Sequence, residues 1–170
     1  MTWTIQKVDE FAPEDVVQTV NHHRLMPAIT EEATAACLAL NSSDVYVVSN
    51  GGDGDVAKVF VHIAPGGGIA SIDMIPNPRY FKVVDDYRDD FREVMAPVLA
   101  DVFANERLRR ITAFVPYSRG RTKKALRTLG FSHEGRIRCG VQFRRKDDPE
   151  DLFVMGMTAQ DYDKEYGDGY

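Results

Sequence analysis

The chain has 170 residues, of which 44% are apolar and 28% charged, and its net charge is −5 at pH 7. This length suits one domain with a hydrophobic core, and the acidic balance argues against a general nucleic-acid binder. No apolar run is long enough to span a bilayer, and residues 1–11 lack the layout of a secretory signal, so we expect a cytoplasmic protein that does not contact membranes.

The first half of the chain predicts two helices and four strands. Trp3 and Ile5 alternate with polar residues, as in a half-buried strand, whereas Val16, Val17 and Val20 recur at helical spacing. The last three strands follow one another through short Gly-rich turns, which is typical of an antiparallel meander. The expected elements are a strand over 2–8, helices over 13–20 and 30–40, and strands over 45–49, 56–63 and 69–75.

The second half predicts a long helix over 85–103, with Pro97 inside it as a point where the helix should kink or divide. A strand over 111–115, a helix over 121–128 closed by Gly130, and strands over 136–143 and 152–157 follow. Together these elements predict a single α/β (α+β) domain over residues 1–160, with a mixed, mostly antiparallel sheet of about seven strands and four helices. Residues 161–170 read as a polar C-terminal tail.

The most informative stretch is residues 123–138, KKALRTLGFSHEGRIR. An amphipathic helix runs into a Leu-Gly-Phe turn, and a Glu-Gly pair and a strand with alternating basic residues follow. This pattern resembles the ribosomal-protein-type branch of the GCN5-related N-acetyltransferase (GNAT) superfamily. The resemblance covers nearly the whole chain in the order of its elements, but only residues 111–157 in recognisable motif. It implies a GNAT-like fold and an acetyl-CoA-dependent N-acetyltransferase that acts on a primary amine of a protein or small molecule.

The resemblance also implies where acetyl-CoA binds as a co-substrate. In the family, the fourth and fifth strands part, the pantetheine arm lies between them, and the next helix start faces the pyrophosphate. Arg119, Arg121 and Lys123 would then help to neutralise the phosphates. The cofactor-binding residues expected on the fourth strand and the loop after it are Met74, Ile75, Arg79, Tyr80, Phe81, Lys82 and Val83.

The chain departs from the family pattern in this cofactor loop, which is degenerate. Pro76 and Arg79 match, but Tyr80 and Lys82 stand where the family has glycines, which let a backbone approach a pyrophosphate closely. A second departure is Arg119, where the family usually has Asn. Leu126 replaces a frequent Tyr general acid, as the ribosomal-protein-type branch tolerates.

Acetyl transfer needs a base for the amine and a proton donor for the thiolate. The candidates for the base are Asp73 on the fourth strand and His62 on the third; Tyr117 or Ser118 would supply the proton. A carboxylate on a central strand is costly unless it is paired, so Asp73 is either functional or a partner for a nearby Arg. His62 also reads as a partly buried sheet histidine.

Two other functions compete with the enzyme. A GNAT-like domain without catalysis would be a structural or interaction protein, such as a phage virion-associated component, in the virion or the host cytoplasm, as a homo-oligomer or with an assembly partner. RNA binding through the basic residues of 107–127 is the third, although few aromatics lie among them. We expect no metal, because neither the histidines nor the cysteines have ligand spacing, and we expect Cys37 and Cys139 to be small buried residues.

Overall fold

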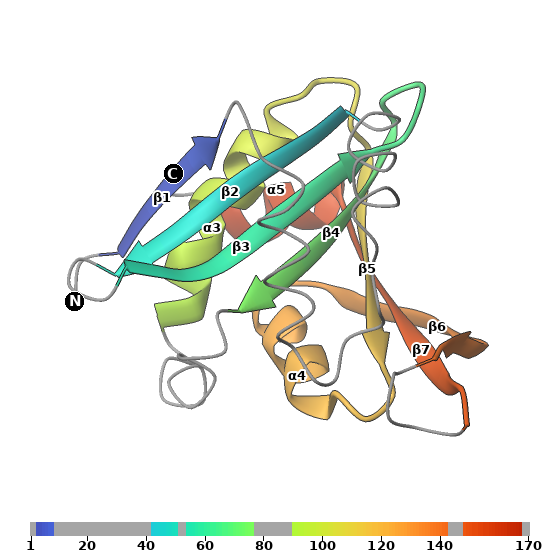
Figure 1. Cartoon of the computed structure of the whole chain (residues 1–170). Coiled ribbons are helices and arrows are strands. Elements are labelled where there is room, and N and C mark those ends of the chain that lie inside the picture. Colours follow the sequence, from blue (N-terminus) through green and yellow to red (C-terminus); the bar gives the residue numbers. More distant parts are fainter. Residues whose placement is uncertain (1–2, 9–41, 51–53, 77–89, 143–147, 168–170) are drawn as a thin grey trace.

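The computed structural model describes residues 3–8, 42–50, 54–76, 90–142 and 148–167 (Figure 1). The strands are β1 Trp3–Val8, β2 Ser42–Asn50, β3 Gly54–Ile63, β4 Ile69–Pro76, β5 Arg110–Pro116, β6 Ser132–Val141 and β7 Glu150–Thr158. The helices in these residues are α3 Asp90–Phe103, α4 Gly120–Thr128 and α5 Ala159–Tyr166. The helices expected over 13–20 and 30–40 lie outside the described residues.

The seven strands form one sheet in the order β1-β2-β3-β4-β5-β7-β6. Every neighbouring pair is antiparallel except β4 and β5, which run parallel at the centre. The prediction of a mixed, mostly antiparallel sheet in an α+β domain is therefore confirmed. The parallel pair divides the sheet into a meander, β1 to β4, and a second antiparallel unit of β5, β7 and β6.

One face of the sheet carries the main core, because alternate strand residues point to the same side. Helices α3 and α5 lie along this face (Figure 1). The largest contribution comes from α3, whose Val98 and Leu99 are fully buried. Sheet residues in the same cluster include Val59, Val61, Ala70, Ile72, Ile111, Ala113, Val115, Met155 and Met157.

Helix α3 is continuous through Pro97, so of the two expected effects of the proline, a kink or a division, the division does not occur. A proline removes one main-chain N–H, which leaves the carbonyl of the residue four positions earlier, Glu93, without its helical partner. Both residues are exposed. Water can therefore satisfy that carbonyl at little cost, and the helix does not have to break.

Helix α4 ends as the sequence predicts. Gly130 has φ +93°, and its N–H donates to the carbonyl of Arg127 at 3.0 Å, while Phe131 donates to Leu126 at 3.0 Å. A left-handed residue after a helix is the conformation for which glycine is best suited. The turn brings Phe131 into the core, where it is 3% exposed.

The C-terminal segment is not the polar tail that the sequence suggests. Residues 159–166 form helix α5, which begins at a capping box between Thr158 and Asp161. Tyr166 is buried, and its hydroxyl donates to the carbonyl of Leu129 at 3.1 Å. Tyr162 stacks on Phe103 of α3, with 4.7 Å between ring centroids. The helix therefore belongs to the domain, and its aromatic residues at spacing four explain why it packs.

Strand β6 also differs from its prediction. It begins at Ser132 rather than at 136, so the Glu134–Gly135 pair lies inside the strand, at an irregularity in its pairing with β7. Cys139 is exposed, with φ 51°, and not the small buried residue expected; Cys37 lies outside the described residues.

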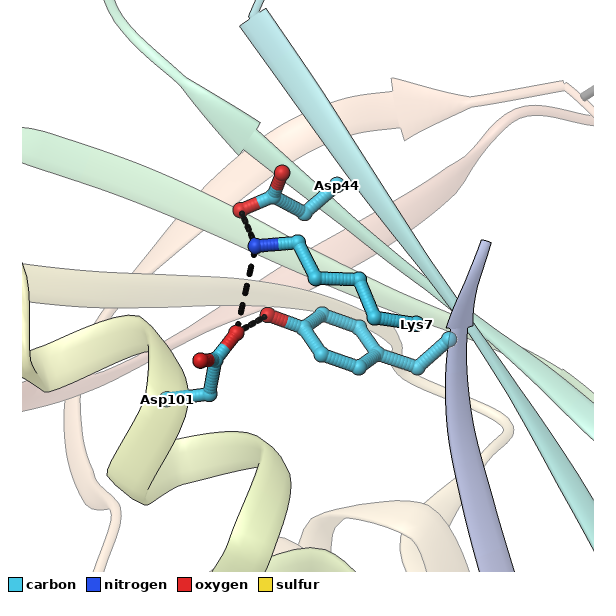
Figure 2. A network of polar contacts seen from close by, with 4 residues as sticks. Lys7, Asp44 and Asp101 are labelled. Atoms are coloured by element: carbon cyan, nitrogen blue, oxygen red, sulfur yellow. Dashed lines mark hydrogen bonds and ion pairs between the residues drawn. The ribbon is translucent and has the colours of Figure 1, made fainter. Parts of the chain in front are cut away.

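A polar network ties β1 and β2 to α3 (Figure 2). The Lys7 ammonium lies 3.1 Å from Asp44 and 3.2 Å from Asp101, and the Tyr46 hydroxyl donates to Asp101 at 2.6 Å. The Tyr46 hydrogen bond, followed by that of Lys7, holds the pKa of the Asp101 carboxyl below its ordinary value despite some desolvation. Burial and the nearby Asp101 raise the pKa of Tyr46 far above its usual value, so the phenol remains a donor.

Candidate functional site

The central parallel pair separates after a short contact. Only three Cα pairs join β4 to β5, Ile69–Arg110, Ala70–Ile111 and Ser71–Thr112, whereas seven join β3 to β4. Beyond Ser71 the two strands spread apart (Figure 1). The expected parting of the fourth and fifth strands is therefore present. Beyond Ser71, the main-chain amides and carbonyls of β4 that point toward β5, and those of β5 that point toward β4, do not pair with each other.

Two of the four catalytic candidates meet at this opening. Residues Ser71 and Asp73 of β4 share a face with His62 of β3, because His62 pairs with Ser71 and Phe60 with Asp73. This face is opposite the one that packs on α3, since Ala70 and Ile72 are buried there. Asp73 and His62 are thus diagonal neighbours: His62 is level with Ser71 of the last β4–β5 pair, and Asp73 is the next residue of β4 on the same face.

The environment of Asp73 changes its acidity. The side chain is exposed to solvent, yet the surrounding sheet removes much of its hydration, and this desolvation raises the pKa of its carboxyl; the positive charge of His62 acts in the opposite direction. No ion pair links Asp73 to another described residue. The interpretation of Asp73 as a partner for a nearby Arg therefore has no support within the described residues.

A second polar cluster lies on the same face beside the last β4–β5 pair. Arg110 forms an ion pair with Glu134, and its Nε donates to the Thr112 hydroxyl at 3.2 Å. Glu134 reaches across β7 above Gly156, where any side chain would collide with its carboxylate. Sequence reasoning missed this cluster; the Glu-Gly pair was noticed, but only the irregular β6 register shows which glycine makes room for the carboxylate.

The other two catalytic candidates belong to a different cluster. Tyr117 follows β5, is 58% exposed, and packs against Phe153 at 5.0 Å between ring centroids. Phe153 pairs with Val115, so its side chain is on the α3 side of the sheet, and Lys123 of α4 lies 3.6 Å above its ring. The Ser118 N–H donates to Glu150. Tyr117 therefore lies on the opposite face of the sheet from the Asp73–His62 pair.

The residues expected to bind the co-substrate are only partly described. Met74 packs against the core, so it can offer only its main chain to the opening. Ile75 lies on β4. The loop residues Arg79, Tyr80, Phe81, Lys82 and Val83 lie outside the described residues. Arg119 is the N-cap of α4, whose first turn contains no acidic residue and holds Arg121 and Lys123.

No group of three or more His, Cys, Asp or Glu side chains in the described ranges is placed to hold a metal ion. Across those same ranges, no helix has the length and apolarity needed to cross a membrane.

Comparison with known proteins identifies the fold. No protein-family model matches the sequence, and no curated protein matches it. Solved structures do match over almost the full length. A GNAT-family acetyltransferase from Streptococcus pneumoniae is 14% identical with a TM-score of 0.69, over 92% of this chain and 99% of that one. The spermidine N-acetyltransferase of Vibrio cholerae, in complex with CoA and spermine, is 15% identical with a TM-score of 0.71, over 94% and 97%.

A putative phosphinothricin N-acetyltransferase is similar to the same degree, with 15% identity and a TM-score of 0.71, over 93% of this chain and 99% of that chain. These neighbours share the overall fold at very low identity. The chain therefore has the GNAT fold, and its activity must be argued from its own residues.

Proposed function

We propose that this chain is an N-acetyltransferase that moves an acetyl group from acetyl-CoA to a primary amine of a protein or small molecule. The observation that carries the proposal is the parting of β4 and β5 after three Cα pairs, with Asp73 and His62 at the opening. Free strand edges suit the amide groups of a pantetheine arm, which can hydrogen-bond in the manner of an added strand. The GNAT fold of the neighbours supports the same function.

The side chains at the opening fit the proton transfers of amine acetylation. A substrate ammonium gives one proton to a base, and the freed nitrogen lone pair attacks the thioester carbonyl carbon. The C–S bond then breaks and sulfur keeps the electron pair. Tyr117 or Ser118 gives its proton to the thiolate and regains one from the nitrogen, which still has a proton to release. Asp73 or His62 serves as the base; a raised pKa makes the Asp73 carboxylate a stronger base than an ordinary aspartate.

The remaining roles follow from position. Arg119, Arg121 and Lys123 at the start of α4 are the proposed cationic partners of the CoA phosphates. Tyr117 and Ser118 stay the proposed proton donors to the thiolate, approaching from the α4 side of the sheet. In this account the protein acts in the cytoplasm.

The alternative is a GNAT-like structural or interaction protein that has lost catalysis, for example a virion-associated component of a phage. The observation that favours it is in the sequence, where Tyr80 and Lys82 replace the glycines of the cofactor loop. Such a protein would assemble with itself or a partner without binding CoA.

A calorimetric titration of the full chain with CoA separates the two. We expect saturable binding, and at a hundredfold excess over Kd a stabilisation of about 2.7 kcal/mol. For a domain of this size that corresponds to a rise in Tm of roughly 5–10 °C. The variant Ile137→Ala, on the far edge strand β6, should bind CoA like the parent chain. The absence of both binding heat and a Tm shift at millimolar CoA would exclude the enzyme and leave the assembly function.

A further inference from the structure

An exposed phenylalanine lies on the part of β5 that no longer pairs with β4. Phe114 is 43% exposed, although Ala113 and Val115 on either side of it are 5% and 2% exposed. Strand β5 is interior to the sheet, between β4 and β7, and large apolar side chains on interior strands are usually covered. Phe114 lies beyond Thr112, the last β5 residue that pairs with β4.

The register places Phe114 across the opening from Asp73. Ser71 and Thr112 are the last pair of β4 and β5, and the next residues on the same face are Asp73 and Phe114. One side of the opening therefore presents a carboxyl group, and the other presents the face or edge of an aromatic ring. An amine that enters between the strands meets both.

Among the described residues near the opening, Asp73 is the one carboxylate on this face that no ion pair holds. Glu134 is held by Arg110 in an ion pair and is also fixed above Gly156. Asp73 forms no ion pair with another described residue, and the nearby charge that acts on it is that of His62. A single carboxylate that no ion pair holds, beside an apolar ring, matches a ligand with one positive charge and an apolar body better than a chain of several ammonium groups.

We propose that the acceptor is a monoamine with an apolar, above all aromatic, carbon skeleton, with its ammonium at Asp73 and its skeleton against Phe114. This inference rests on the acetyltransferase function proposed above, and it assigns Phe114 as the residue that determines acceptor specificity. It sets the chain apart from its structural neighbour that carries the name spermidine N-acetyltransferase, whose substrate has several charges.

The test is a comparison of kcat/KM for 2-phenylethylamine, ethanolamine and spermidine at saturating acetyl-CoA. For the parent chain we expect 2-phenylethylamine to be preferred at least tenfold over each of the other two, as expected for an apolar contact of this size. Phe114→Ala should raise the KM for 2-phenylethylamine about tenfold and leave the KM for acetyl-CoA unchanged. Phe114→Leu, which keeps an apolar side chain, should fall between the two.

Two exposed apolar residues provide matched controls. Ile69 lies on the same face of β4 as Asp73, but where β4 still pairs with β5. Ile137 on β6 has the same 43% exposure as Phe114. Ile69→Ala and Ile137→Ala should keep the preference of the parent chain. The inference would be overturned, with the acetyltransferase function intact, if the parent chain preferred spermidine. The same holds if Phe114→Ala kept the preference of the parent chain, or if it changed the KM for acetyl-CoA and not that for the amine. No turnover with any amine would overturn both.

Discussion

Two carboxylates of the molecule, Asp101 and Asp73, lie in contrasting surroundings. The contrast separates a structural site from a candidate functional one. Asp101 accepts hydrogen bonds from Tyr46 and Lys7, and these partners lower its pKa (Figure 2). Asp73 lies on a sheet face that desolvates it, and its pKa is raised. The fold satisfies Asp101 with hydrogen bonds but desolvates Asp73, so it keeps Asp73 at a cost in stability. Such a cost is typical of catalytic groups.

Changing Asp73 should give the largest effect, and it should affect activity. Asp73→Asn keeps the shape but removes the charge and the basicity, so we expect kcat to fall by about 10²–10⁴-fold if Asp73 is the base. His62→Gln tests the other candidate in the same assay. Steady-state kinetics of both variants identify the base, because only the true base should lose activity to that extent. If both retain the parent kcat, the opening does not supply the base.

Breaking the satisfied cluster should affect stability instead. Tyr46→Phe removes the hydroxyl that donates to Asp101 at 2.6 Å from a residue that is 2% exposed. The loss of a hydrogen bond to a charged group predicts a destabilisation of about 2 kcal/mol, measured by urea unfolding. The kcat of the folded variant should equal that of the parent chain. A kcat that falls with Tyr46→Phe would mean that the two clusters are coupled.

The two carboxylates should respond to pH with opposite signs. A lowered pKa means that the unfolded chain binds the proton more tightly at Asp101, so this stabilisation is present above the unfolded pKa and is lost as pH falls through the folded pKa. A raised pKa means that the folded chain binds the proton more tightly at Asp73, so stability is lost as pH rises from the unfolded toward the folded pKa.

Unfolding free energies measured from pH 3 to pH 7 check this pair of signs. At neutral pH Asp73→Asn should be more stable than the parent chain, and Asp101→Asn should be less stable. The Asp101 effect should be modest, because half of that side chain is in solvent. If both substitutions changed the unfolding free energy relative to the parent chain with the same sign and the same trend in pH, the proposed difference between the two sites would be contradicted.

The smallest effect is expected at Lys7. Its side chain is 44% exposed, and its ammonium contacts Asp44 and Asp101. Exposed ion pairs contribute little, so Lys7→Met should destabilise the chain by about 0.2–1 kcal/mol, less than Tyr46→Phe. A larger loss at Lys7 than at Tyr46 would show that charge, and not the buried hydroxyl, holds this cluster together.

Periodicity in the sequence predicted much of the fold. Alternation in residues 56–63 and 69–75 defined strands of the meander, and Gly130 marked the end of α4 because only a left-handed residue fits there. Helix α5 was missed because its composition is polar, although Thr158 and Asp161 form a capping box and two tyrosines stand four residues apart.

The site was less accessible to sequence reasoning. Asp73 and His62 were named as candidates because polar residues on interior strands are costly. Phe114 was not, because alternation in residues 111–115 assigns a face but cannot show that the neighbouring strand withdraws. Glu134 was missed for a similar reason, since its position above Gly156 depends on the irregular β6–β7 register.

Hydrogen–deuterium exchange of the free and CoA-bound chain tests most directly whether the parted strands receive the co-substrate. We predict that amides in residues 72–75 of β4 directed toward β5 exchange faster than those in residues 69–71, and that CoA slows them selectively. Equal protection along β4 in the free chain, unchanged by saturating CoA, would contradict the account.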